Sequence, residues 1–191
     1  GAGDFTIDFW VNFSSVAGIV PLVNQWETSA SYRSWDVYIN SNGLCLEYST
    51  TGANYTDLCN NWTPSTSQWH HIAVVRTGNI VRQFVNGNQL GSDLSISGSL
   101  YNSSWVVQLG HAFYSGGTHY YLNGYIDELR ITKGIARWTS DFTVPDKAYG
   151  GFALTDDITS SATTLTFDSA NPSDLMKFGP SGVVKTGDEY I

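Results

Sequence analysis

The clearest alternation of apolar and polar residues lies near the start of the chain, in the segment FTIDFWVNF at residues 5–13. Every second residue there is apolar, which predicts a β-strand with one fully apolar face. Two further short runs, at residues 35–40 and 44–48, flank the sequence Ser41-Asn42-Gly43, whose residues favour a tight hairpin turn. The first third of the chain is therefore expected to form antiparallel strands.

The segment WHHIAVVRTGNIVRQFVNGNQLG at residues 69–91 carries the strongest pattern. Residues 72–75 are apolar at every position, which predicts a strand that is covered on both faces. The turn residues Thr77-Gly78-Asn79 and Asn86-Gly87 separate this strand from two others, because Gly and Asn tolerate the positive φ of hairpin turns. We predict a three-stranded antiparallel meander at the centre of a sheet.

The remaining patterns favour short strands joined by polar segments. Strands are predicted at residues 19–23 and 105–109 and, as the closing strands, within residues 120–132; polar loops or connections are predicted at 27–34, 50–57, 60–68, 92–104 and 112–119, and a turn of helix at 133–139. The predicted fold class is all-β: an antiparallel two-sheet jelly-roll sandwich over residues 1–148, followed by a small partial β appendage at 149–191.

Charge limits the partners that such a protein can have. The chain has 191 residues, a net charge of −8 and no basic cluster. This argues against nucleic acid and anionic membranes as partners, and no apolar run approaches the 18 residues of a membrane-inserted helix. A neutral glycan, a cation or another protein fits the charge better.

Four segments, in order, carry a resemblance to a known family: DFTIDFWVNF at 4–13, WDVYINSNGLCLEYS at 35–49, WHHIAV with FVNG within 69–87, and LNGYIDELRITKGIARWTSDF at 122–142. Together they resemble the laminin-G-like and pentraxin-like branch of the concanavalin A-like lectin/glucanase superfamily. The last segment resembles the version common in phage tail and other virion structural proteins.

That resemblance implies a sandwich fold and, as expectations, a place in a virion tail or an extracellular setting, with neighbouring virion protein modules as partners. The chain begins almost within its first predicted strand and ends in what looks like another. We therefore expect it to be a piece of a longer protein. Fold alone does not fix function, because such folds host many unrelated activities.

Two cysteines allow one internal disulfide. Cys45 and Cys59 lie symmetrically about Gly52, so a hairpin turning there places them opposite each other, within reach of a bridge. The same register sets Glu47 opposite Asp57, an unfavourable pair unless a cation or solvent relieves it. A disulfide and two separate thiols both remain open, and a disulfide would indicate an oxidising or extracellular setting.

Paired carboxylates are the first chemistry to consider, because glycosidases need two carboxyl groups across the scissile bond. Related glucanases of this fold carry an E-x-D-x-x-E strand motif, and Asp127-Glu128 is the nearest match here, with the other acids missing. Adjacent strand residues point to opposite faces, so this pair cannot act together. We predict that the protein is not an enzyme and keep glycan hydrolysis as the weaker alternative.

A metal is the second possibility. The resemblance implies a calcium ion held by one aspartate and backbone carbonyls, and Asp127 matches that position in its G-x-I-D-E segment. The alternative is an outward Asp beside a β-bulge, bonded to a backbone amide or to Arg130. His70 and His71 are adjacent and face opposite sides, and His111 and His119 are interpreted as packed or surface residues rather than metal ligands.

Aromatic residues in polar loops are the third candidate. Rings at such positions are typical of lectin sites, where Trp and Tyr stack on sugars while Asn bonds their hydroxyl groups. The predicted glycan-binding residues are Tyr32, Tyr55, Trp62, Tyr101 and Tyr114, with Asn54 and Asn61 beside them. We expect a non-catalytic, lectin-like module that binds a cell-surface glycan or polysaccharide. The alternative is that the rings only cap the sandwich, in a structural or assembly module without ligand.

Overall fold

The computed structural model describes residues 3–28, 32–114 and 117–145. None of these residues is helical, so no helix among them is long and apolar enough to cross a membrane. The strands are β1 (Phe5–Ser15), β2 (Val20–Gln25), β3 (Trp35–Asn40), β4 (Gly43–Tyr48), β5 (Thr56–Asn60), β6 (Trp69–Thr77), β7 (Ile80–Val85), β8 (Asn88–Ser95), β9 (Gln108–Leu109), β10 (His111–Tyr114), β11 (Thr118–Tyr121) and β12 (Asn123–Lys133).

The chain divides into two compact units, Gly1–Val144 and Pro145–Ile191. The twelve strands found among the described residues all belong to the first unit. The β appendage predicted at residues 149–191 lies outside the described residues.

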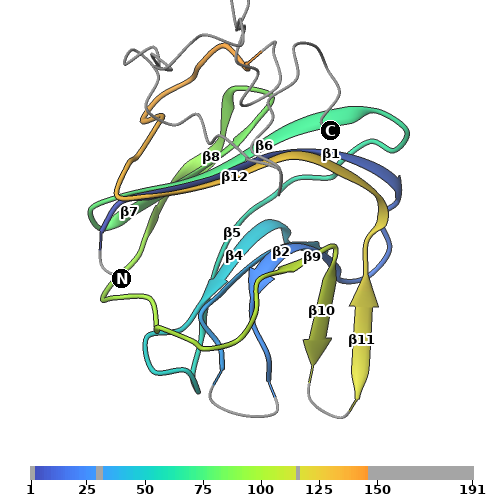
Figure 1. Cartoon of the computed structure of the whole chain (residues 1–191). Coiled ribbons are helices and arrows are strands. Elements are labelled where there is room, and N and C mark those ends of the chain that lie inside the picture. The colour runs from blue at the N-terminus through green and yellow to red at the C-terminus, as the bar shows by residue number, and fades with distance from the viewer. Residues whose placement is uncertain (1–2, 29–31, 115–116, 146–191) are drawn as a thin grey trace, which may run out of the picture. The chain divides into compact units, whose positions relative to one another are not determined.

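Two five-stranded antiparallel sheets stack face to face, as Figure 1 shows. The first sheet has the order β12-β1-β6-β7-β8 and the second the order β5-β4-β3-β2-β9. The short hairpin β10–β11 stands beside the second sheet. The predicted all-β two-sheet sandwich is confirmed.

Alternation along the strands builds the core between the sheets. Phe9, Val11 and Phe13 of β1 have no exposed surface, and neither have Val37 and Leu46 of the second sheet. Burying one such side chain contributes roughly 1.5–3 kcal/mol. Burial of these alternating side chains therefore supplies most of the free energy that holds the two sheets together. It also sends the intervening polar residues of both sheets to the two outer faces.

The outer face of the first sheet is covered by residues 134–144, which we call the strap. The rings of Trp138 and Phe142 stack with centroids 3.9 Å apart and, with Ala136, cover a small second core of Ala73, Val75 and Phe84. Residues 72–75 are buried on both faces, as their sequence predicts.

The helical turn predicted at 133–139 is wrong. Lys133 ends β12, and the strap bonds to the sheet instead of to itself. Gly134 N donates to Asp4 O, Arg137 N to Thr6 Oγ1 and Phe142 N to Gly87 O. These tertiary bonds outweigh the weak helical preference of so short a segment.

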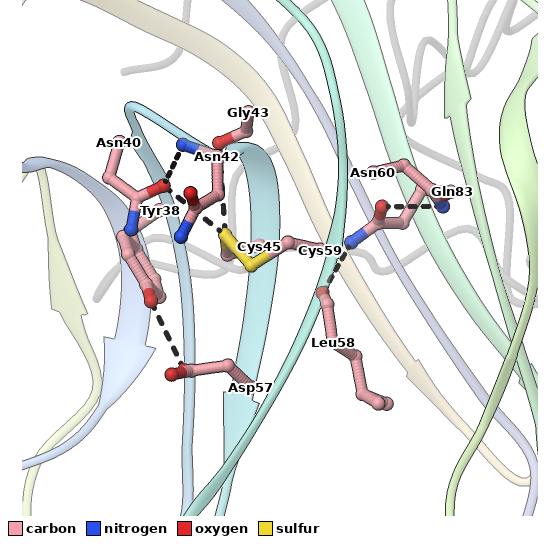
Figure 2. Close-up of a disulfide and its surroundings, with 10 residues drawn as sticks. All are labelled: Tyr38, Asn40, Asn42, Gly43, Cys45, Asp57, Leu58, Cys59, Asn60 and Gln83. Carbon is pink, nitrogen blue, oxygen red and sulfur yellow. Dashed lines mark hydrogen bonds between the residues drawn. A yellow bond between two sulfur atoms is a disulfide. The ribbon is translucent and has the colours of Figure 1, made fainter.

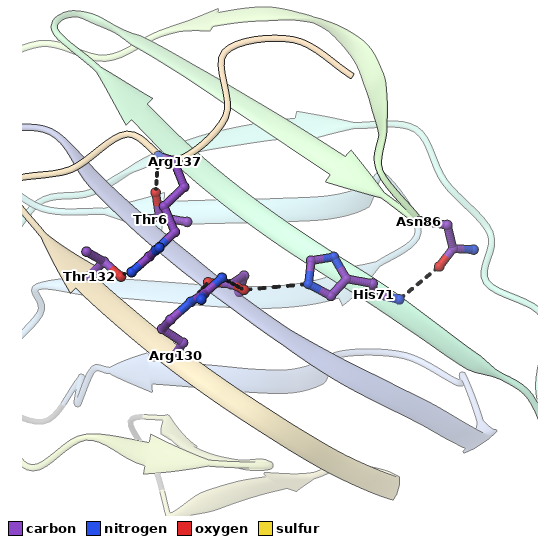
Figure 3. A network of polar contacts seen from close by, with 7 residues as sticks. Thr6, His71, Asn86, Arg130, Thr132 and Arg137 are labelled. Carbon is purple, nitrogen blue, oxygen red and sulfur yellow. Dashed lines mark hydrogen bonds and ion pairs between the residues drawn. The ribbon is translucent and has the colours of Figure 1, made fainter. Parts of the chain in front are cut away.

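Beneath the strap lies a buried polar network, drawn in Figure 3. Asp8 has no exposed surface, and Arg130 donates to both of its carboxylate oxygens at 3.0 and 2.9 Å. His71 Nε2 lies 3.5 Å from Asp8 Oδ2. Thr6 Oγ1 donates to Ile135 O and accepts from Arg137 N, which fastens the strap to β1.

Several sequence predictions need correction. The meander β6-β7-β8 is confirmed as three antiparallel strands, but β8 forms an edge of the sheet and runs on to Ser95. The strand predicted at 105–109 is reduced to two residues. The loop predicted at 112–119 is the hairpin β10–β11, which turns through Gly117 at a φ of 80°. The closing strands predicted within residues 120–132 are the end of β11 and most of β12, and β12 has a β-bulge at Glu128, whose φ is 51°.

Candidate functional site

A row of polar residues crosses the outer face of the second sheet. In register, Gln108 of β9 pairs with Asn24 of β2, Asn24 with Asp36 of β3, Asp36 with Glu47 of β4, and Glu47 with Asp57 of β5. Opposite residues in antiparallel strands have Cβ atoms about 4.5–5.5 Å apart, so neighbouring side chains in this row are in contact range. We call Asp36, Glu47 and Asp57 the acidic row.

Two carboxyl groups of the acidic row are buried. Asp36 has no exposed surface and Glu47 is 5% exposed, whereas Asp57 is exposed. Burial raises the pKa of Asp36 to about 7, against the hydrogen bond from Tyr114, and Asp57 adds to the rise. Burial, followed by the charges of Asp36 and Asp57, raises the pKa of Glu47 to about 8, which Arg33 opposes. Near neutral pH, these two groups therefore hold protons for much of the time.

Two tyrosines donate to the row. Tyr114 Oη, from the hairpin, lies 3.2 Å from Asp36 Oδ2, and Tyr38 Oη lies 3.1 Å from Asp57 Oδ1 (Figure 2). Burial and then the nearby carboxylates raise the pKa of both phenols, so they remain hydrogen-bond donors. Each thus satisfies one carboxylate oxygen.

Next to the acidic row, Cys45 and Cys59 form a disulfide between β4 and β5, as Figure 2 shows. The register is the one predicted from a hairpin centred on Gly52, with Glu47 opposite Asp57. The expected repulsion between Glu47 and Asp57 in that register is relieved in two ways. The raised pKa of Glu47 favours its neutral form, and Tyr38 donates to Asp57.

Three loops meet at the end of the second sheet next to the acidic row. Backbone bonds join them: Arg33 N to Gly52 O, Ser49 N to Ser34 O, and Tyr101 N to Ser49 O. Side chains add Ser34 Oγ to Tyr101 O at 2.6 Å. These ties bring together a group that we call the rim cluster: Tyr32, Arg33, Asn54, Tyr55, Tyr101 and Trp105.

The rim cluster presents two sets of rings. Tyr32 and Trp105 stack with centroids 5.5 Å apart. The Arg33 guanidinium lies 5.8 Å from the Tyr55 ring and 6.0 Å from the Trp26 ring, within cation–π range. Tyr55 is 56% exposed and Tyr32 is 37% exposed, so both rings are open to a ligand. Trp26 is fully buried and meets Tyr55 edge-on, which supports the exposed ring from below.

The other predicted residues lie elsewhere. Trp62 is half-buried and packs edge-on against Phe13 and His70, which favours the structural alternative for its ring. Asn61 is exposed just beyond the opposite end of β5, six residues and roughly 20 Å of strand from Tyr55. Tyr114 is half-buried and bonds to Asp36 instead of joining the rim cluster.

Sequence reasoning also missed a histidine pair. His111 and His119 lie on one face of the hairpin β10–β11, with His111 Nε2 2.9 Å from His119 Nδ1, and both rings stack with Tyr121. Diagonal positions on two predicted strands would have revealed this pair, but the segment was interpreted as a loop. Burial, and then His119, lower the pKa of His111, which favours neutral imidazole there.

The calcium expectation centres on Asp127. Its side chain is exposed, its Oδ1 accepts a hydrogen bond from Glu128 N at 2.8 Å, and Arg130 bonds to Asp8. In the part of the chain that the structure describes, no three His, Cys, Asp or Glu side chains gather to hold a metal ion. Asp127 could therefore supply one carboxylate, with backbone carbonyls and water as the remaining ligands. Calcium binding stays a prediction.

A sequence profile of the Laminin_G_3 family, described as the concanavalin A-like lectin/glucanases superfamily, matches residues 1–138. The chain belongs to this superfamily. No curated protein sequence matches the chain.

Similar solved structures include the CBM40 module of the Ruminococcus gnavus IT-sialidase, at 18% identity and a TM-score of 0.55, covering 72% of this chain and 79% of that one. Domain 4 of AbnA, a GH43 extracellular arabinanase from Geobacillus stearothermophilus in complex with arabinotriose, has 19% identity and a TM-score of 0.52, covering 70% and 62%. Domains LG4-5 of the mouse laminin alpha1 chain have 12% identity and a TM-score of 0.52, covering 69% and 36%. At these identities the likeness concerns the fold.

Proposed function

We propose that this protein is a non-catalytic carbohydrate-binding module and that the rim cluster is its glycan-binding surface. The observation that carries the proposal is the gathering of exposed rings, a guanidinium and an amide side chain from three separate loops at one end of the second sheet. A loop cluster held by a rigid sandwich is a common arrangement for a binding site.

The chemistry of the rim cluster suits a sugar. The exposed faces of Tyr32 and Tyr55 can stack on the apolar face of a pyranose or furanose ring. Asn54 and Arg33 can bond hydroxyl groups at the ring edge. Support comes from neighbours whose structures hold sugars, such as the CBM40 module bound to α2,3-sialyllactose and the arabinanase domain with arabinotriose.

The finer context is also part of the proposal. The segment at 122–142 resembles those of phage tail proteins, which favours a module of a virion tail or another extracellular assembly. Its partners would then be a cell-surface glycan or polysaccharide and neighbouring virion protein modules. The disulfide between Cys45 and Cys59 fits an extracellular setting.

A glycan array with the full chain tests the function. Tyr55→Ala and Tyr32→Ala should each lower the signal at least tenfold, because each removes an exposed ring. Tyr125→Ala is the matched control: its ring is 67% exposed but lies on β12 of the first sheet, so the signal should persist. Silence across neutral, acidic and bacterial polysaccharide glycans would instead favour the structural or assembly module without ligand.

One observation favours a second candidate, glycan hydrolysis. Asp36 and Glu47 are directly opposite on neighbouring strands, and a carboxyl pair about 5 Å apart, one of them protonated near pH 7, is what retaining glycosidases use. Both carboxyl groups are buried, however, and Tyr114 bonds to Asp36, so a glycosidic bond has no open path to them. Release of reducing sugar from any polymer, lost in Glu47→Gln, would establish this activity.

A further inference from the structure

Acidic groups outnumber basic groups at the candidate site. Three carboxyl groups follow one another across β3, β4 and β5, and Arg33 is the cation that opposes the rise in the pKa of Glu47. Asp57, at the outer end of the acidic row, is exposed, and it lies two residues after Tyr55, which directly precedes β5. A ligand on the rim cluster therefore lies near the exposed carboxyl group of Asp57, whereas the raised pKa values of Asp36 and Glu47 weaken the negative charge of those two groups near neutral pH.

Arg33 is already engaged within the protein. Its Nη1 donates to Ala53 O, its Nη2 donates to Thr28 O at 3.3 Å, and its guanidinium lies against the rings of Tyr55 and Trp26. Its Nε is buried. Because two of its five N–H donors are bonded to the backbone and its Nε is buried, this guanidinium has fewer donors left for a ligand carboxylate than an unengaged arginine has.

A second, independent feature is a shortage of donors inside the row. Asn24 and Asp36 are directly opposite, both have no exposed surface, and each has a buried side-chain oxygen, Oδ1, without a hydrogen-bond partner. Asn24 Nδ2 donates a hydrogen bond to His111 O at 2.7 Å, so the amide turns its acceptor atom, Oδ1, toward Asp36. Both side chains are buried, so a ligand does not touch these oxygens, and they add no donor that could offset the repulsion of a ligand carboxylate.

We propose that this face selects neutral, hydroxyl-rich glycans and rejects glycans that carry a carboxylate, sialylated ones included. The inference rests on the proposed carbohydrate-binding function and adds the class of glycan. It separates this module from the CBM40 structures that hold sialyllactose, despite the shared fold. Specificity of this kind arises from repulsion of the wrong ligand as much as from attraction of the right one.

The test uses array pairs that differ only by a terminal sialic acid, with the full chain at pH 7.5 and 50 mM NaCl. The neutral member of each bound pair should give at least ten times the signal of the sialylated member. This ratio should fall at least fivefold at 500 mM NaCl, because salt screens exposed charges. It should also fall at least fivefold in Asp57→Asn. Asp93→Asn, which neutralises an exposed acid paired with Arg82 on the first sheet, should leave the ratio unchanged.

The outcomes separate this inference from the function on which it rests. Sialylated members bound as strongly as their neutral partners, or more strongly, would overturn the selectivity and leave carbohydrate binding intact. A neutral preference that survives both high salt and Asp57→Asn would also overturn it, because the preference would not be electrostatic. No binding to any glycan would overturn both proposals.

Discussion

Each outer face of the sandwich contains a buried aspartate, and the two aspartates differ in the partners that surround their carboxyl groups. On the first sheet, Asp8 has no exposed surface and meets Arg130 through both carboxylate oxygens, with His71 at 3.5 Å. On the second sheet, Asp36 is equally buried but receives one tyrosine hydroxyl, and its other oxygen has no partner. The first carboxylate is compensated as a charge, whereas the second is most stable when it is protonated.

The two faces also differ in how well they are covered. The strap covers the first face with stacked apolar rings, and its backbone accepts one hydrogen bond from Thr6 Oγ1 and donates another to it. The second face ends in the rim cluster, whose rings are exposed. A face whose buried carboxylate is paired and whose rings form an apolar cover serves stability, and a face with unpaired acceptors and exposed rings is where binding is expected.

The largest predicted difference concerns pH. Asp36 and Glu47 have folded-state pKa values of about 7 and about 8, above the usual values for carboxyl groups in an unfolded chain. Between pH 4 and pH 8 the folded state therefore binds more protons, so the free energy of unfolding falls as pH rises through this window and levels off outside it. With one pKa unit worth about 1.4 kcal/mol, the rise from 3.8 to about 7 in Asp36 and from 4.5 to about 8 in Glu47 corresponds to a loss on the order of 4 kcal/mol from each group.

Urea unfolding at pH 5 and pH 9 measures this loss. The variant Asp36→Asn/Glu47→Gln is the control, because it removes both titrating groups while keeping their shapes. The difference in unfolding free energy between wild type and variant should change by several kcal/mol across this range. A difference that is the same at both pH values would mean that the acidic row does not titrate as described.

Asp8→Asn should give the next largest effect. Removing the carboxylate leaves the Arg130 guanidinium without its anion beneath the strap, and breaking a buried pair in this way costs about 3 kcal/mol. The measurement is the midpoint of chemical denaturation at pH 7. Asp93→Asn, in the exposed pair with Arg82, should change stability by less than about 1 kcal/mol. Equal effects of the two variants would contradict the role given to the buried network.

Phe142→Ala should have a smaller effect. The ring is half-buried between Trp138 and Phe84, so its loss should cost roughly 2 kcal/mol, less than for a fully buried Phe. Tyr55→Ala, on the open rim, should cost less than about 0.5 kcal/mol. The midpoint temperatures of thermal unfolding of the two variants compare the contributions of the strap and the rim cluster to stability. A larger loss for Tyr55→Ala would show that the rim ring is structural.

Much of the fold follows from short-range patterns. Alternation at 5–13 fixes the inward face of β1, and the apolar run at 72–75 indicates a strand covered on both sides. Turn residues set the registers of the hairpins β3–β4 and β6–β7. What those patterns could not predict is what covers the first sheet, because the strap is held by contacts with residues more than 50 positions away.

The candidate site was only partly accessible to such reasoning. Tyr32, Tyr55 and Tyr101 stand out as rings in polar loops, and the structure brings them together, whereas the same criterion also selects Trp62, whose loop folds back onto the core. The acidic row was only partly found. The hairpin centred on Gly52 predicts Glu47 opposite Asp57, but the turn at Ser41-Asn42, which sets Asp36 opposite Glu47, was not used to extend the row to a third strand.

The most direct test of the central claim is NMR mapping of backbone amides in the full chain during titration with an array-positive neutral glycan. The account predicts that the largest shift changes occur in the rim cluster, at Tyr32, Arg33, Asn54 and Tyr55, while the amides of the strap and of Trp62 stay unchanged. Saturable changes centred on the strap or on β12, with the rim cluster unaffected, would contradict it.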